Sequence, residues 1–275
     1  MRSIHFYQVF GTIGTAAALL GAPANVRAQV QVAQNDGRAA SAAGDVSDSE
    51  DARATYKFKS RSDSISWDRS RAAAAKSSGF RIVVSLKDRH VWAVIGSDTV
   101  LSAPAAVAKG TTLEFGNATY KFVTPRGVRT VLGKEADPIW QPPEWLYAEV
   151  AQEHGLKLGH LYAGKSIKLN DGRTLTVRDG VVGLIQNGEF AAMPTDEHIV
   201  FDNTLYVPPL GTQNRKVEGE LGKYRLILGD GFLLHGTPYK NSIGLAATHG
   251  CVRLRDEDIE WLYEHVPVGT KVYIY

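Results

Sequence analysis

The sequence has very little cysteine and almost no imbalance of charge. Cys251 is the one cysteine among 275 residues, so an internal disulfide is excluded. Lysine and arginine number 31 against 29 aspartate and glutamate residues, a formal net charge of +2. A chain so balanced provides no strong field for nucleic acid or for an anionic membrane. Neither a glycine-rich phosphate loop nor a repeat of solenoid period is present. We expect no nucleic-acid partner, and the partner must be inferred from a site.

The first 28 residues have the layout of a secretory signal peptide. Arg2 precedes an apolar run at residues 9–20, and small residues follow up to Ala28. The run is shorter than the roughly 20 residues that span a bilayer, although an uncleaved signal anchor stays open. No cysteine follows that could carry a lipid at a new N-terminus. We predict cleavage after Ala28 or Ala24 and export to the periplasm or cell wall.

Residues 29–78 are rich in Ala, Ser, Asp and Arg and have few large apolar side chains before Tyr56. Such a segment cannot bury enough apolar surface to offset its chain entropy. We predict a flexible spacer, within which residues 66–78 could form a short helix. The sequence leaves open whether the spacer also tethers the protein to a surface.

The pattern from residue 79 to residue 275 is mainly β. Short runs of β-branched residues are separated by turn residues, which is typical of an antiparallel meander. These runs lie at 80–86, 90–95, 99–108, 118–123 and 128–133. Residues 222–237 predict two more strands about a Gly-Asp-Gly turn, so that His235 ends a strand. A helix with an acidic first turn is predicted at 255–266, followed by a closing strand.

A long segment, about residues 146–217, interrupts this β pattern as an α+β insertion. A helix is predicted at 142–155, because Leu146 and Val150 have helical spacing and Gly155 can end the helix. Short strands joined by Asn-Asp-Gly and Arg-Asp-Gly turns follow it. The insertion could add strands to the main sheet or form a lid.

Cys251 follows a Thr-His-Gly tripeptide, where Gly250 allows a sharp turn that presents the thiol. An unpaired thiol in an exported protein is a liability unless it is buried or used. The alternative is a small, inert, buried side chain. A nucleophilic cysteine needs a base, because the thiolate is the attacking species. The neighbouring residues therefore decide between these interpretations.

Two histidines lie near Cys251 in the sequence. His235 lies 16 residues before it at a strand end, and a residue on a neighbouring strand can face the sulfur, so we prefer it as the base. His249 either orients the site or is a structural turn residue. Arg253 would face the same side as Cys251 in an extended segment and could clamp a carboxylate. A metal site from these three Cys and His residues lacks a completing ligand, and we expect neither metal nor cofactor.

The segment HGTPYKNSIGLAATHGCVRL, residues 235–254, resembles the signature of the L,D-transpeptidase (YkuD-like) catalytic domain. Supporting resemblances are TPRG at 124–127, the Pro- and Trp-rich DPIWQPP, and ELGKYRLIL before His235. Together they cover roughly residues 80–145 and 218–275. The resemblance implies a mainly β fold, a β-sandwich or barrel with a few short helices. The segment between DPIWQPP and ELGKY is longer than we expect in a minimal catalytic domain of this kind.

The resemblance also implies a reaction. Members of this family cross-link peptidoglycan stem peptides: the cysteine attacks the third residue of a tetrapeptide, D-Ala leaves, and an amine resolves the thioester. Cys251 would be the nucleophile and His235 the base, with the Gly236 carbonyl orienting the imidazole. Arg253 would hold a substrate carboxylate. We expect the imidazole to generate an anionic sulfur ready for acylation, so that alkylation of Cys251 stays fast below pH 7.

By the same resemblance, the backbone N–H groups of His249, Gly250 and Cys251 would surround the oxyanion. Thr237 and Thr248 would line the substrate site. The implied partners are peptidoglycan stem peptides, with a wall-attached protein as another conceivable acceptor, and we expect a monomer. Two alternatives stay open: a carboxypeptidase or amidase that gives the same thioester to water, and a non-catalytic wall-binding domain.

Overall fold

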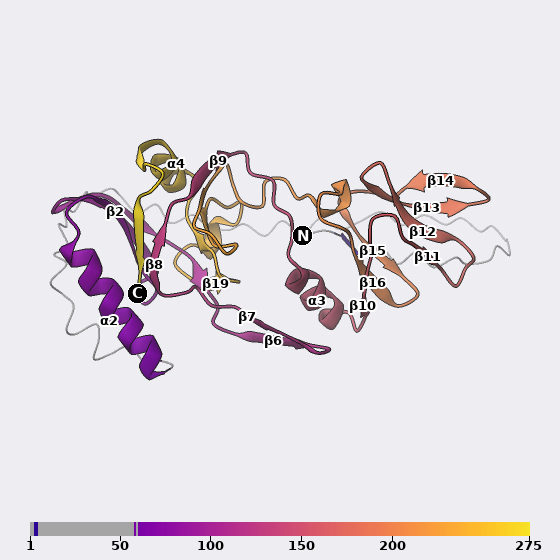
Figure 1. Cartoon of the computed structure of the whole chain (residues 1–275), viewed down its shortest axis with the longest axis horizontal. Coiled ribbons are helices and arrows are strands. Elements are labelled where there is room, and N and C mark those ends of the chain that lie inside the picture. The colour runs from indigo at the N-terminus through magenta and orange to yellow at the C-terminus, as the bar shows by residue number, and fades with distance from the viewer. Residues whose placement is uncertain (1–2, 5–57, 59) are drawn as a thin grey trace, which may run out of the picture.

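The computed structural model describes residues 3–4, 58 and 60–275. The described chain is elongated (Figure 1). The main sheets, which lead to the segments around His235 and Cys251, lie at one end, and the inserted segment lies at the other. Of the predicted signal peptide, 1–28, only the strand β1 (Ser3–Ile4) is described, and it pairs in parallel with β15. The rest of that segment, and residues 29–57 of the predicted spacer, lie outside the described residues.

A five-stranded sheet lies at the end of the molecule away from the insertion (Figure 1). Its strand order is β4-β3-β2-β21-β8. Its strands are β2 (Phe80–Ser85), β3 (His90–Ile95), β4 (Asp98–Pro104), β8 (Gly127–Thr130) and β21 (Lys271–Ile274). The antiparallel meander predicted for β2 to β4 is present. The closing strand β21 lies parallel to β2 and antiparallel to β8. The C-terminal strand thus completes the sheet that the N-terminal strands begin.

A four-stranded sheet, β20-β18-β17-β9, packs beside it through a shared apolar core. Its strands are β9 (Gly133–Ala136), β17 (Tyr224–Ile227), β18 (Leu233–His235) and β20 (Val252–Arg253). Leu226, Leu234 and Val252 are at most 1% exposed and pack in one cluster with Ile259 of helix α4 (Asp256–His265). Because side chains alternate along a strand, the residues between these leucines and valines point to the opposite face. That face carries the candidate site.

Smaller elements complete this end of the molecule. They are the pair β5 (Val107–Ala108) and β19 (Ala246–Thr248), the hairpin β6 (Thr112–Phe115) and β7 (Ala118–Lys121), and the short 3-10 helix η2 (Lys240–Ser242). The fold is mainly β, as predicted, with sandwich-like sheets. In the described part of the chain each sheet is open, and none closes into a barrel.

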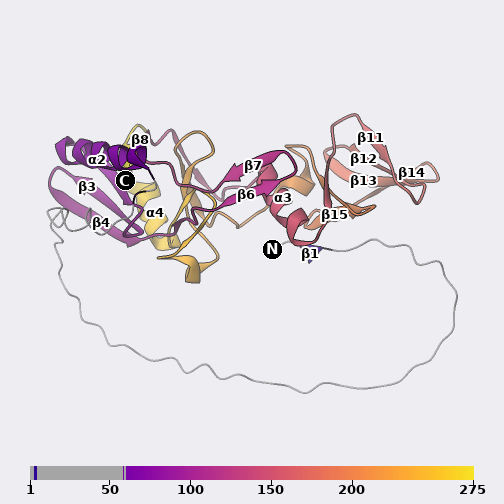
Figure 2. The same ribbon diagram turned by 90° about the horizontal axis from the view of Figure 1, so that it is seen from below.

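Helix α2 (Arg61–Lys76) occupies the end of the segment predicted as a spacer. It is longer than the short helix expected there and packs on β21 and β8 (Figures 1 and 2). Trp67 is 2% exposed and meets the ring of Tyr275 edge to face at 5.7 Å. Asp63 forms an ion pair with Arg126. The Trp67 ring and the Asp63–Arg126 ion pair thus help to attach a helix whose composition is mostly polar.

The insertion forms a lobe of its own. It contains helix α3 (Glu144–Glu153) and seven strands: β10 (Lys157–His160), β11 (Ser166–Lys168), β12 (Thr174–Arg178), β13 (Val181–Gln186), β14 (Glu189–Ala192), β15 (Glu197–Phe201) and β16 (Thr204–Val207). A short 3-10 helix, η1 (Gln213–Arg215), follows them. The lobe has two apolar clusters separate from the core of the main sheets. It therefore does not add strands to the main sheet, one of the two possibilities left open by the sequence.

The chain enters and leaves the lobe at one place. Trp140 and Val217 form an isolated antiparallel bridge, and Arg215 donates to the carbonyls of Pro142 and Pro208. The lobe is thus closed at its base.

Among the helices of the described residues, none is long and apolar enough to span a bilayer.

Candidate active site

Four polar side chains form a row across the face of the sheet β20-β18-β17-β9 that points away from the core. Glu135 pairs with Arg225, Arg225 with His235, and His235 with Arg253. Directly paired residues present their side chains on the same face of a sheet. The row therefore places one imidazole between two guanidinium groups.

Cys251 joins this face from the residue just before β20. Because Arg253 pairs with His235 and strand residues alternate, Cys251 lies beside Leu233, diagonal to His235 on the same face. The thiol is free and partly exposed, and its Sγ lies 3.8 Å from the carbonyl oxygen of Gly231. The register thus places the predicted nucleophile, in the bend just before β20, beside the strand that ends at the predicted base.

The ring of His235 is fixed by the residue that follows it. The side chain is 4% exposed, and its Nδ1 donates a hydrogen bond to the carbonyl oxygen of Gly236 at 2.6 Å. A carbonyl oxygen can only accept, so Nδ1 carries the proton of the neutral ring. Nε2 is left unprotonated and can serve as a base.

The buried environment keeps the His235 imidazole neutral. The pKa of His235 is lowered from 6.5 to about 4, first by burial and then by the charge of Arg253. Hydrogen bonds to the carbonyls of Gly236 and Leu221 raise the pKa, and the charge of Arg225 lowers it again by a smaller amount. The ring is therefore unprotonated at neutral pH.

The thiol is also neutral at rest, which differs from the anionic sulfur expected from the sequence. Burial raises the pKa of the Cys251 thiol, and this outweighs a backbone hydrogen bond to Leu233 and the charges of Arg253 and Arg225, which lower it. The physical reason is that the thiolate and the imidazolium both lose water in this site. A preformed ion pair with His235 is therefore not favoured.

The turn before Cys251 requires glycine. Gly250 has φ +155°, and a Cβ atom there would lie 3.2 Å from the ring of Phe232. Thr248 is 2% exposed and donates from Oγ1 to the Cys251 carbonyl at 2.6 Å, while the Gly250 N–H approaches the same Oγ1 at 3.4 Å. The Thr248 hydroxyl therefore shapes the turn from within, rather than lining an open substrate site.

Thr237 follows His235 by two residues, and Arg253 ends the row. Thr237 is fully buried and accepts a hydrogen bond from the backbone N–H of Tyr239 at 3.0 Å. The Thr237 hydroxyl therefore holds the loop that follows His235. Arg253 donates from Nη1 to Ser242 at 3.3 Å, while its buried Nε has no partner among the described residues. That unpaired donor suits an anionic ligand.

The side chain of His249 contacts helix α3 of the inserted lobe and two residues outside the lobe. Its ring stacks on Trp145 of α3 at 4.0 Å with an interplanar angle of 15°, and meets Phe122 edge to face at 4.6 Å. Its Nε2 lies 3.0 Å from Glu149 Oε2 and 3.1 Å from Lys109 Nζ. Burial lowers the pKa of His249, although Glu149 acts to raise it. Sequence reasoning found the helix but not this contact, because no local signal connects residues 100 positions apart.

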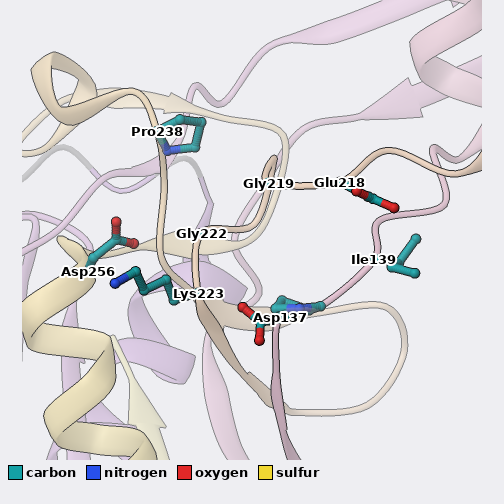
Figure 3. A pocket seen from close by; sticks show the side chains of 9 residues that line it. Asp137, Ile139, Glu218, Gly219, Gly222, Lys223, Pro238 and Asp256 are labelled. Atoms are coloured by element: carbon teal, nitrogen blue, oxygen red, sulfur yellow. The ribbon is translucent and has the colours of Figure 1, made fainter. Parts of the chain in front are cut away.

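A cavity of about 550 Å³ opens at the base of the lobe, beside the loop that follows His235 (Figure 3). Its walls come from the two segments through which the chain enters and leaves the lobe, from the loop after His235 and from the start of α4. They comprise Asp137, Pro138, Ile139, Glu218, Gly219, Gly222, Lys223, Pro238 and Asp256. Neither Cys251 nor His235 lines it. In the described residues no three His, Cys, Asp or Glu side chains are grouped to hold a metal ion.

Comparisons with known proteins agree on one family. The family model YkuD, the L,D-transpeptidase catalytic domain, matches residues 79–274. "Probable L,D-transpeptidase YbiS" of Escherichia coli is 48% identical over 66 residues, which are 24% of this chain and 20% of that protein. "Probable L,D-transpeptidase ErfK/SrfK" of Salmonella typhimurium is 44% identical over 57 residues, 21% of this chain and 18% of that protein. The match thus spans about a fifth of the length of these curated relatives.

Among solved structures, an L,D-transpeptidase from Xylanimonas cellulosilytica overlaps with 76% of this chain and 68% of its own. The TM-score is 0.38 and the sequence identity 17%.

Proposed function

The chain belongs to the YkuD family of L,D-transpeptidase catalytic domains, and from this premise we propose that it is an L,D-transpeptidase acting through a thioester on Cys251. The observation that carries the proposal is the pairing of His235 with Arg253 on adjacent strands, which puts Cys251, two residues before Arg253, beside the strand that ends at His235. The tautomer that Gly236 imposes leaves Nε2 of the ring able to take a proton.

The reaction begins from a neutral pair. As Sγ of Cys251 attacks the carbonyl of the third stem residue, its proton passes to Nε2 of His235 and a carbon–sulfur bond forms. The tetrahedral intermediate collapses, the imidazolium returns its proton to the departing amine of D-Ala, and a thioester remains. The pKa of about 4 makes His235 a weak base but a strong acid toward the leaving amine. An acceptor amine then displaces the thiol and restores Cys251.

Two groups supply charge complementarity. The buried and unpaired Nε of Arg253 would bind a carboxylate of the donor stem. The N–H groups of the Gly250 turn would face the oxyanion as negative charge develops. Both roles place positive or partly positive groups where the substrate carries or gains negative charge.

The acceptor and the location complete the proposal. An amine of a second stem peptide would give a 3-3 cross-link, and an amine of a wall-attached protein would give attachment. The protein would be exported as a monomer to the periplasm or cell wall by the signal peptide in residues 1–28, with residues 29–57 as spacer.

The direct test is the intact mass of the protein during incubation with a disaccharide tetrapeptide. We expect an adduct corresponding to the acyl tripeptide, release of D-Ala, and no adduct in Cys251→Ala. Absence of both adduct and D-Ala release, or turnover by Cys251→Ala, would overturn the proposal. Product masses then identify the acceptor: cross-linked dimers support transpeptidation, whereas tripeptide alone identifies a carboxypeptidase.

A further inference from the structure

Helix α3 of the lobe contacts the nucleophile turn through two side chains one helical turn apart. Trp145 and Glu149 are separated by four positions and so lie on the same side of the helix. Trp145 covers the flat face of the His249 ring, and Glu149 Oε2 meets its Nε2 at 3.0 Å. One imidazole, two residues before Cys251, is thus held on its face and on its edge by the same helix.

Lys109, which follows β5, closes this cluster from the other side. Its Nζ lies 2.7 Å from Glu149 Oε1 and 3.1 Å from His249 Nε2. Its backbone N–H donates to the Thr248 carbonyl at 2.8 Å. Lys109 therefore holds the backbone of Thr248 through its own backbone N–H, and it holds the side chain of His249 through its Nζ. Helix α3, the β5 segment and the nucleophile turn meet at this point.

These contacts orient the His249 ring more than they stabilise the fold. The side chains of Lys109, Glu149 and His249 are 28%, 34% and 24% exposed, and ion pairs with this access to water contribute little to folding. They do restrict the direction in which the His249 ring lies. Since Gly250 follows it with an unusual φ, the ring and the position of the sulfur are linked through two residues of a tight turn.

We infer that Glu149 and Trp145 are positioning residues, through which the inserted lobe holds His249 and the turn that carries Cys251 in the geometry required for acylation. The inference rests on the proposed function, because it assigns to the lobe a part in that same reaction. It gives a physical reason for a lobe with its own core to be attached beside the catalytic strands.

The test compares acylation rates in Glu149→Gln and Trp145→Phe. Glu149→Gln keeps the shape and removes the charge, and Glu153→Gln, an exposed residue on the same helix, is its matched control. We expect the acylation rate constant of Cys251 by the tetrapeptide to fall about 10-fold or more in Glu149→Gln, because small errors in placement cost rate steeply. Trp145→Phe should lose less, since a smaller ring can still stack. The control should match the wild type.

A second measurement separates positioning from general damage. In an NMR titration the pKa of His249 should fall in Glu149→Gln, because this carboxylate raises it while Lys109 and Arg253 lower it. The midpoint of thermal unfolding should stay close to that of Glu153→Gln. Equal acylation rates in the two variants would overturn the inference while leaving the proposed function intact. Lack of acylation in the wild type would instead refute the proposed function itself.

Discussion

Arg225 lies directly opposite His235 on the neighbouring antiparallel strand, and its Nε donates to Glu135 on the next strand at 2.8 Å. The guanidinium is thus fixed beside the imidazole by a carboxylate on its far side. Its charge lowers the pKa of both His235 and Cys251. Arg225 therefore keeps the resting imidazole neutral and favours loss of the thiol proton.

Replacing Arg225 should make the thiol harder to ionise. In Arg225→Met the pKa of Cys251 is expected to rise, because a cation that favours the thiolate is lost. At a fixed pH below that pKa, alkylation by iodoacetamide should slow about 3- to 10-fold, since each pKa unit is tenfold in thiolate. The pH profile of alkylation measures the shift. Arg173→Met, which breaks an ion pair with Asp171 in the lobe, should leave the profile unchanged, and an unshifted profile in Arg225→Met would contradict the assignment.

Removing the base should separate acylation from simple thiol reactivity. In His235→Ala, acylation by the tetrapeptide is expected to fall by about 100-fold or more, because no group takes the proton during attack. Alkylation by iodoacetamide should change little, since the neutral imidazole does not stabilise a resting thiolate. Intact mass follows both reactions in the same samples.

His265→Ala, an exposed histidine at the end of α4, is the matched control and should behave as wild type. Rapid alkylation of the wild type at pH 6 that disappears in His235→Ala would show a resting ion pair. That result would restore the expectation drawn from the sequence and contradict the directions of the two pKa shifts.

Acid should destabilise the protein through His235. Its pKa is about 4 in the folded protein and 6.5 in the unfolded chain, so the unfolded chain binds the proton first as pH falls. The free energy of unfolding should thus decrease between pH 6.5 and pH 4, by about 3 kcal/mol from this group, and should be level above pH 7. The lowered pKa values of His90 and His249 act in the same direction.

Urea unfolding at pH 7.5, 5.5 and 4.5 measures the slope. His235→Asn should be less stable at pH 7.5, because a buried ring is lost, yet its stability should depend less on pH than that of the wild type. An equal slope in the two proteins would mean that His235 has the same pKa in the folded and unfolded states and that its burial has no electrostatic consequence.

The residues that the sequence predicts for the candidate site are mostly local in the chain. Gly250, Cys251 and Arg253 lie within four positions of one another, and His235 ends a strand whose turn residues mark it clearly. Alternation along β20 and β18 then fixes which side chains share a face. The antiparallel meander and the helix α4 were predictable for the same reason, since short-range periodicity specifies them.

Contacts between distant segments could not be predicted in this way. The parallel pairing of β21 with β2, the ion pair of Arg225 with Glu135, and the contact of His249 with Glu149 each join segments far apart in sequence. Periodicity tells which face of a strand is buried but not which strand lies beside it. The ionisation states were mispredicted for a related reason, because desolvation depends on everything that surrounds the group.

The separate apolar cores predict that the lobe and the catalytic sheets can be destabilised independently. Leu175 is fully buried in the core of the lobe, and Leu234 is fully buried in the core of the main sheets. Either leucine replaced by alanine should lower local stability by about 2–5 kcal/mol through the cavity it leaves. In Leu175→Ala, hydrogen exchange followed by mass spectrometry should show lost protection in β11 to β14, with β17 and β18 still protected. Leu234→Ala should show the reverse. Equal loss of protection along the whole chain in both variants would mean that the protein opens as one cooperative unit, because local opening free energies would then all equal the global value.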